Sequence, residues 1–312
     1  METDDFVKSL YNKDIELFKK VNKGDLHVHG ILGSSRINFN SKFQNTLPSF
    51  EKATNIYDLK AYIAKNIISY SKEKENYLTL LDLTIKTALD YGVKTIAVSI
   101  DYRTVDYQFE SNLENFINSL KVLKQKYINK IIIIYDLGIS RENFKKNDEK
   151  LIKELIQTQT FGAIDLYGDE LSQPIEYFIN IYRYAEQNKL ELKAHVGEYG
   201  TAIDVVTAIK KLHLNTVQHG IAITTNIKAV NYAKKRNIKF NVCPTSNIKM
   251  GVVKSITDHP IKKMFDLGLI VTINTDDQLI FESSLYDEYI KLLDNNIFSA
   301  EELNCIRKNS II

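Results

Sequence analysis

The chain has 312 residues, of which 44% are hydrophobic and 26% are charged, so it can bury a large core. Its 41 basic and 39 acidic residues leave a formal net charge of +2 spread along the sequence, which excludes a broad basic surface for nucleic acid. The two cysteines, Cys243 and Cys305, form no disulfide framework, and residues 1–10 resemble neither a signal peptide nor a membrane anchor. We therefore expect a cytoplasmic protein without a membrane partner.

Eight short apolar runs alternate with amphipathic segments along the chain. The predicted strands are residues 26–29, 95–100, 131–135, 163–166, 190–196, 216–219, 239–242 and 269–274. The segments between them, including 77–89, 113–123, 175–187 and 202–212, repeat apolar residues at helical spacing. This alternation predicts an α/β fold, a TIM-type (β/α)8 barrel formed by one domain over residues 1–312. No glycine-rich phosphate loop of dinucleotide-binding form follows the first strand, which disfavours an open doubly wound sheet.

One long irregular region, residues 31–57, follows the first predicted strand and contains Pro48 and several polar residues. Segments of that length without regular structure are uncommon inside a compact domain and are usually functional. We therefore expect this region to form a lid or a part of the substrate pocket.

Two histidines stand one residue apart in the first predicted strand. Alternate side chains of a strand project to the same face, so His27 and His29 lie together while Leu26 and Val28 face the other way. Two imidazoles on one face can chelate a metal, although such pairs also occur by chance in proteins without one.

Further groups of ligand or acid–base type stand at or just after the ends of later strands. They are Gly168 after the fourth strand, His195 and Glu198 at the fifth, His219 at the sixth, and Asp276 and Asp277 at the eighth. In a TIM-type barrel the catalytic groups gather at the carboxyl ends of the strands. These residues are therefore expected to converge with the first histidine pair.

The imidazoles of His27, His29 and His195 and the carboxylate of Asp276 form a ligand set suited to zinc. If the coordination shell expands beyond four ligands, a further position is left for water or substrate. A zinc ion lowers the pKa of bound water to about 7 and so supplies hydroxide at neutral pH. Glu198 then moves protons to and from the substrate, or is an exposed loop residue.

The other polar residues at the strand ends each have two interpretations. His219 either steadies the hydroxide or takes its proton, or it is a core or surface histidine. Asp277 either hydrogen-bonds the substrate or caps the next helix. His213 and His259 have no partner pattern around them, and we expect both to be structural.

The sequence resembles the adenosine deaminase family of zinc amidohydrolases. The resemblance lies in ordered short blocks through most of the chain, at residues 25–29, 164–170, 195–198, 219–220, 243–247, 259–261 and 274–277. Zinc deaminases of nucleic-acid bases use a His-x-Glu and a Pro-Cys-x-x-Cys pattern instead, which this sequence lacks.

The resemblance implies four zinc ligands, which are His27, His29, His195 and Asp276. It implies a catalytic set of Glu198, His219 and Asp276, in which Glu198 protonates purine N1 and His219 orients the attacking hydroxide. It also implies that the backbone of Gly168 contacts N3 and that Asp277 contacts N7. Attack at C6 and loss of ammonia would convert an adenine ring into hypoxanthine.

The sequence departs from the family two residues after the second histidine. Adenosine deaminases have an aspartate there that holds the ribose 5′-hydroxyl, and this chain has Ile31. An apolar residue suits a 5′ substituent without a hydrogen-bond donor, such as methylthio, whereas the neighbouring Ser34, Ser35 and Arg36 suit a phosphate. Two more departures, which reshape the pocket without touching the zinc chemistry, are Tyr167 in place of a small residue and Gln278 in place of proline.

The sequence therefore predicts a zinc-dependent hydrolase that deaminates adenosine or a 5′-modified adenosine, with a small purine nucleoside as its partner. One alternative is an adenine deaminase or another zinc hydrolase of a small molecule, in which the region around Ile31 contacts something other than a sugar. Another is a non-catalytic purine-binding protein that keeps the fold. The latter is disfavoured because every inferred ligand and proton-transfer group is present.

Overall fold

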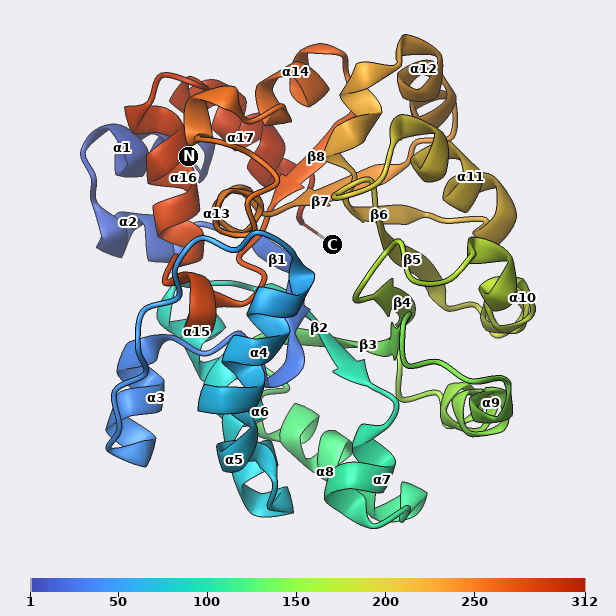
Figure 1. Cartoon of the computed structure of the whole chain (residues 1–312). Coiled ribbons are helices and arrows are strands. Elements are labelled where there is room, and N and C mark those ends of the chain that lie inside the picture. Colours follow the sequence, from blue (N-terminus) through green and yellow to red (C-terminus); the bar gives the residue numbers. More distant parts are fainter. Residues whose placement is uncertain (1, 312) are drawn as a thin grey trace.

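Eight parallel strands form one sheet in the computed structural model, which describes residues 2–311 (Figure 1). The strands are β1 (Gly24–His29), β2 (Thr95–Asp101), β3 (Ile132–Ser140), β4 (Ala163–Tyr167), β5 (Glu191–Val196), β6 (Thr216–His219), β7 (Lys239–Val242) and β8 (Ile270–Ile273). Met1 and Ile312, the outermost residues of the expected domain, lie outside the described residues.

Each strand pairs in parallel with the next one along the chain, in the order β1 to β8. The two ends of the sheet meet just beyond β8, where Val28 and Asp276 form a parallel bridge and the Asp276 amide donates to the carbonyl oxygen of His27 at 3.0 Å. The predicted (β/α)8 barrel is therefore confirmed. This closure brings the carboxyl ends of all eight strands to one rim.

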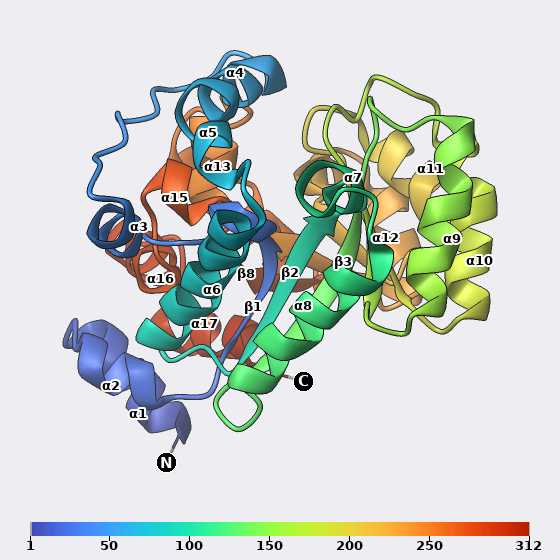
Figure 2. The ribbon, with the colours of Figure 1, turned by 90° about the horizontal axis from the view of Figure 1, so that it is seen from below.

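Helices surround the sheet and cover its outer face (Figures 1 and 2). The α-helices are α1 (Glu2–Tyr11), α2 (Ile15–Lys20), α3 (Arg36–Phe43), α4 (Ile56–Asn66), α5 (Ile68–Ser71), α6 (Lys74–Asp90), α7 (Thr104–Phe109), α8 (Leu113–Lys126), α9 (Glu149–Gln157), α10 (Ile179–Gln187), α11 (Ala202–Leu212), α12 (Ile227–Lys235), α13 (Pro244–Lys249), α14 (Ile261–Asp266), α15 (Gln278–Phe281), α16 (Leu285–Asp294) and α17 (Ala300–Lys308). Short 3₁₀ turns are η1 (Gly30–Leu32), η2 (Lys146–Asp148), η3 (Ile175–Phe178), η4 (Ile221–Thr225) and η5 (Ile256–Asp258). The four helical segments singled out in the sequence are all present. Within residues 2–311, no helix is long and apolar enough to cross a membrane.

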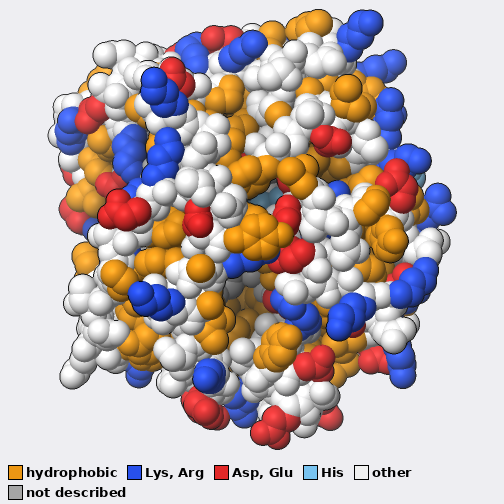
Figure 3. Space-filling model, in the orientation of Figure 1, with side chains coloured by type: hydrophobic (Ala, Val, Ile, Leu, Met, Phe, Trp, Pro, Cys, Tyr) orange, Lys and Arg blue, Asp and Glu red, His pale blue; other side chains and the backbone are white. Residues whose placement is uncertain are grey.

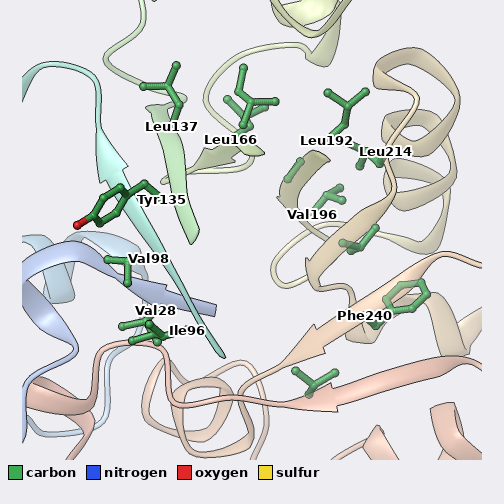
Figure 4. Packing of buried hydrophobic residues seen from close by; sticks show 14 of the residues in the cluster. Val28, Ile96, Val98, Tyr135, Leu137, Leu166, Leu192, Val196, Leu214 and Phe240 are labelled. Carbon is green, nitrogen blue, oxygen red and sulfur yellow. The ribbon is translucent and has the colours of Figure 1, made fainter. Parts of the chain in front are cut away.

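Side chains of the strands alternate between an apolar outer layer and a polar interior. Leu166 and Leu192 belong to the outer layer, part of which is drawn in Figure 4. Asp165 and Lys193, their neighbours along the strands, lie inside the barrel and are 0% and 2% exposed. This alternation determines which residues at the strand ends point into the mouth of the barrel.

The third strand is longer than the sequence predicted. The strand was predicted to end at Tyr135, but β3 continues to Ser140. Asp136 lies inside the barrel and accepts a hydrogen bond from Lys193 Nζ at 2.8 Å. A buried charge on one strand is thus compensated by a partner two strands away, which the local sequence does not reveal.

The region 31–57 is only partly irregular, so the prediction of one unstructured stretch is wrong for its first part. After η1, Ser35 caps α3 by accepting a hydrogen bond from the Asn38 amide, and the chain is irregular only between α3 and α4. Helix α4 stands on the side of the barrel toward which β2 and β3 point (Figure 2). Tyr57 at its start donates to Asp169 Oδ2 at 2.7 Å, in the loop after β4.

Candidate active site

A cavity of about 420 Å³ opens at the carboxyl ends of the strands. In the view down this rim, the surface is hollowed near its centre and a histidine side chain is visible at depth (Figure 3). The polar groups of its base are His29, His195, Glu198, His219, Asp276 and Asp277, whereas one wall is formed by apolar residues of η1, α4 and α15. The cavity therefore combines a polar base with an apolar side.

Three histidines and one aspartate converge at this base. His195 Nε2 lies 3.0 Å from His27 Nε2 and 3.3 Å from His29 Nε2. Asp276 Oδ1 lies 3.4 Å from His29 Nε2 and 3.7 Å from His27 Nε2. Tetrahedral zinc with bonds of about 2.0–2.1 Å separates its ligand atoms by about 3.3 Å. The three predicted histidine ligands are thus spaced as ligands of one cation, and Asp276 lies beside two of them.

The hydrogen bonds of His27 and His195 also fit a cation. His27 Nδ1 lies 3.5 Å from the carbonyl oxygen of Asn241, and His195 Nδ1 lies 3.2 Å from both Asp165 Oδ1 and the carbonyl oxygen of Leu166. In the neutral rings each Nδ1 therefore donates, which leaves both Nε2 atoms as lone pairs that face each other. Two opposed lone pairs need a positive charge between them, and a bound metal supplies it.

Burial keeps His27 in the neutral form that a ligand requires. It lowers the pKa of His27 well below its ordinary value, and the neighbouring imidazoles of His219 and His195 lower it further. Cys243 Sγ is close, at 3.4 Å from His27 Nδ1, but this is the ring nitrogen that faces away from the cluster. Burial raises the pKa of the Cys243 thiol well above its usual range. Cys243 therefore lies outside the cluster of Nε2 atoms and forms a second group of possible ligands with His27 and His219.

Asp165 contacts Nδ1 of His195 and so orients the ring, with Nε2 toward the cluster. Asp165 was not singled out from the sequence. It is 0% exposed, and its other oxygen accepts a hydrogen bond from Ser99 Oγ at 3.0 Å. Carboxylates of this kind fix the tautomer and the ring orientation of ligand histidines. A signal was present in the sequence, because Asp165 is the one charged residue in the apolar run of β4.

Left-handed backbone turns follow several strands at this rim. His219 and Asp276 have φ of 59° and 60°, and Gly168 has φ of 97°. Such values are uncommon outside glycine and mark functional or strained positions. A Cβ on Gly168 would also collide with the carboxylate of Glu142. These turns aim side chains and backbone groups at the cavity instead of along the strands.

The proton-transfer candidates lie beside the ligand cluster. His219 Nε2 is 3.8 Å from Glu198 Oε2 and 3.7 Å from Asp276 Oδ2. Burial, together with the negative charge of Asp276, raises the pKa of Glu198 to about 8. Glu198 is therefore protonated at neutral pH and can act as an acid.

Glu170 holds the loop that carries Glu198, and the sequence analysis did not assign it a role. Its carboxylate accepts hydrogen bonds from the backbone amides of Glu198, at 3.2 Å, and of Gly200. Its only sequence signal is its place in the block 164–170. The contact appears only once β4 and β5 lie side by side.

Asp277 is buried at the cavity and has an unsatisfied atom. Its Oδ1 has no hydrogen-bond partner among residues 2–311, and its side chain makes no capping bond to α15. The helix-capping alternative is therefore wrong. Burial and the adjacent charge of Asp276 raise the pKa of Asp277 well above its ordinary value. A protonated carboxyl can donate to a ligand that fills the cavity.

Two residues that depart from the family pattern, Ile31 and Tyr167, line the cavity. Ile31 belongs to its apolar wall. Tyr167 donates to the Asp101 carboxylate, and its ring centre lies 5.3 Å from that of His29. Gln278, the third departure, is buried at the start of α15 outside the cavity lining.

The residues that suggested a phosphate are used within the protein. Arg36 donates to the carbonyl oxygens of Leu279, at 3.1 Å, and of Leu47, at 2.7 Å. The two cations of the cavity lining are paired as well, Lys60 with Glu142 at 2.6 Å and Arg103 with Asp101 at 3.0 Å. This arrangement weakens the phosphate alternative, because no cation in the lining is left without a carboxylate.

The two remaining histidines differ in their surroundings. His213 is exposed at the end of α11 and pairs with Glu186 at 3.0 Å, as expected of a structural residue. His259 was also expected to be structural, and it is buried beside a polar partner. Its Nε2 lies 3.2 Å from Oδ1 of the buried Asn247, which in turn contacts Glu198 and His219.

Comparison with known proteins places this geometry in context. Residues 85–312 match the family model described as adenosine deaminase. A protein of Treponema pallidum, provisionally named adenosine/adenine deaminase, is 30% identical over 299 residues, covering 95% of this chain and 100% of the relative. The crystal structure of an adenine deaminase from Arthrobacter aurescens shares the fold, with a TM-score of 0.79, 21% identity and 92% coverage of both chains. An amidohydrolase from Burkholderia ambifaria with bound zinc has a TM-score of 0.74 at 20% identity, covering 94% of this chain and 85% of the other.

Proposed function

Since the chain belongs to the adenosine deaminase family, we propose that it removes the 6-amino group of adenosine or a 5′-modified adenosine by zinc-dependent hydrolysis. The spacing of His27, His29, His195 and Asp276 carries this proposal. We further propose that the whole chain works as a single hydrolase domain, since the residues assigned here come from five of its eight strand ends or the loops that follow them.

The metal site is proposed to hold zinc through His27, His29, His195 and Asp276. Nitrogen and carboxylate ligands without thiolate suit a catalytic zinc. A zinc ion held there supplies positive charge that makes water a nucleophile at neutral pH. The zinc in the Burkholderia ambifaria neighbour, which has the same fold, agrees with this choice of metal.

Glu198 is proposed to donate the proton that makes C6 reactive. Purine N1 is an acceptor in adenine, so its partner must be a donor, and the raised pKa of Glu198 keeps this carboxyl protonated. His219 lies between Glu198 and Asp276 and is placed to orient the water that adds to C6. The proton of the new C6 hydroxyl passes to the amino group, the C6–N bond breaks, and ammonia leaves. The product carries a carbonyl at C6 and a hydrogen on N1, so water enters and ammonia departs in equal amounts.

Asp277 and Gly168 are proposed to hold the other edges of the purine. N7 is an acceptor, and burial raises the pKa of the Asp277 carboxyl at the cavity, which favours the protonated form that can donate to N7. The backbone of Gly168 is proposed to contact N3, since Gly168 lines the cavity at a left-handed turn. Three ring nitrogens would then each meet a donor, which fixes the orientation of the ring.

The apolar wall around Ile31 supports a sugar with an apolar or small 5′ group. No aspartate holds a 5′-hydroxyl here, and the cations of the lining are already paired, so a phosphate gains little. The second candidate is free adenine, which is favoured by Tyr167. Its ring beside His29 fills space that a small residue leaves open for the sugar side of a nucleoside.

A substrate panel with zinc-loaded protein tests these proposals. We expect ammonia release and a purine absorbance change with adenosine and 5′-deoxy-5′-methylthioadenosine, and weak turnover of the 5′-phosphate. Equal or better turnover of adenine would establish the second candidate, since a base-specific enzyme gains nothing from ribose. Absence of turnover with every adenine base, nucleoside and nucleotide would refute both.

A further inference from the structure

A buried asparagine links the two proton-handling residues of the proposed site. Asn247, in α13, is 0% exposed. Its Nδ2 donates to Glu198 Oε1 at 2.7 Å and lies 3.2 Å from His219 Nδ1. The two hydrogens of one amide nitrogen are thus shared between the acid and the histidine.

The orientation of this amide is fixed from the far side by His259. The backbone amide of Ile261 donates to His259 Nδ1 at 3.1 Å, and a backbone N–H can only donate. Burial lowers the pKa of His259 to about 3, so its ring is neutral and carries its one hydrogen on Nε2. That hydrogen points to Asn247 Oδ1 at 3.2 Å. Asn247 must therefore present its oxygen to His259 and its nitrogen to the active site.

The orientation of the Asn247 amide also determines the tautomer of His219. Because the Asn247 amide nitrogen has only hydrogens to offer, His219 Nδ1 has to accept and carries no proton. The proton of the neutral ring is then on Nε2. This atom faces Asp276 Oδ2 and Glu198 Oε2 at the base of the cavity. His219 is therefore a hydrogen-bond donor toward the added water and cannot take its proton through Nε2.

Asn247 also determines which oxygen of Glu198 carries the proton. Oε1 already accepts from Asn247, so the hydrogen of the protonated carboxyl belongs on Oε2. Oε2 is the oxygen that lies near His219 Nε2, on the side of the cavity. The amide thus prevents the acid from turning its proton toward the protein interior.

We propose that Asn247 and His259 are positioning residues that fix the proton of His219 on Nε2 and the proton of Glu198 on Oε2, where the purine and the added water meet them. The kinetic part of this inference rests on the proposed function. The direction of the hydrogen bonds does not depend on the proposed function.

The kinetic test uses substitutions of His259 in the zinc-loaded full-length protein. His259→Leu removes the donor to Asn247 and frees the amide to turn over, so kcat should fall about 10- to 100-fold, as for other residues that orient active-site groups, with KM and zinc content unchanged. His259→Gln keeps an N–H donor and should recover most of the loss. Met264→Ala, a buried packing change on the adjoining α14, should lower thermal stability and leave kcat unchanged.

The second test observes the ring directly. Protein labelled with ¹⁵N-histidine should give, for His219, a bare Nδ1 and a protonated Nε2 in the unaltered chain, and a mixture of tautomers in His259→Leu. Unchanged kcat in His259→Leu overturns the proposal, and so does a proton on Nδ1 of His219. If the unaltered protein deaminates no adenine compound, the proposed function fails, and the tautomer measurement still decides the orientation of Asn247.

Discussion

His27 Nε2 and His195 Nε2 lie 3.0 Å apart although 168 positions separate the two residues in the chain. Each ring has its Nδ1 next to a carbonyl or carboxylate oxygen, so two neutral rings present bare Nε2 atoms to each other. The contact is favourable only when a cation lies between the two rings. The contact between the two rings therefore predicts that the protein binds a metal ion at this position.

Purified protein should contain about one zinc ion per chain, and His195→Ala should lose both the metal and the activity. Removal of this imidazole takes away one ligand and leaves His27 without its counterpart. Metal analysis after gel filtration measures the outcome. His213→Ala, at an exposed ion pair, is the control and should keep the metal. Full zinc occupancy in His195→Ala would contradict the assignment.

Asp165→Asn should weaken zinc binding about 10- to 100-fold without changing the ligands themselves. The carboxylate that accepts from His195 Nδ1 at 3.2 Å would be replaced by an amide that no longer enforces this tautomer. Competition with a metal chelator measures the affinity. Asp106→Asn, at an exposed acid in α7, should leave it unaltered. Equal affinities of Asp165→Asn and the unaltered protein would exclude a positioning role.

Glu198→Gln should reduce turnover about 10²- to 10⁴-fold, which is the usual contribution of a positioned acid. An amide cannot release a proton to N1, but it retains the size of the side chain and a contact to Asn247. Zinc content should not change, since Glu198 is not among the proposed ligands. Steady-state kinetics and metal analysis on the same sample decide the matter, and wild-type turnover would remove Glu198 from its role.

The kcat/KM of the enzyme should fall as the pH rises through about 8. Burial and the charge of Asp276 raise the pKa of Glu198 to about 8, and its protonated form is the active one. Below that value the carboxyl holds its proton, and above it the proton is lost together with the ability to protonate N1. A pH profile on a substrate without ionisation in this range tests the prediction. A profile that stays flat well above pH 8 would be inconsistent with it.

Ile31→Asp should shift the preference from 5′-deoxy-5′-methylthioadenosine toward adenosine by about tenfold or more, because a hydroxyl gains a charged hydrogen-bond partner and an apolar group loses its contact. Ile31 lines the cavity, whereas Ile37 is 79% exposed on α3. Ile37→Asp is therefore the matched control and should leave the ratio of kcat/KM values unchanged. An unaltered ratio in Ile31→Asp would show that the 5′ group lies elsewhere.

The strands could be predicted from the sequence because parallel strands covered by helices are nearly continuous apolar runs. The prediction was wrong where a polar residue inside the barrel interrupted such a run. The third strand was predicted to end at Tyr135, but it continues through Asp136, which is a buried partner of Lys193. Helix α3 was missed because its sequence has little amphipathic pattern and it begins with a serine cap within a polar stretch.

The sequence by itself determined which chemical groups stand at the ends of which strands, and with them the family and the candidate ligands. Only the tertiary structure decided the distances between them and the partners that orient them, Asp165 for His195 and the pair Asn247 and His259 for His219. The physical reason is that a strand's side-chain alternation is local, whereas a hydrogen-bond partner depends on the register of neighbouring strands and on the closure of the barrel between β8 and β1.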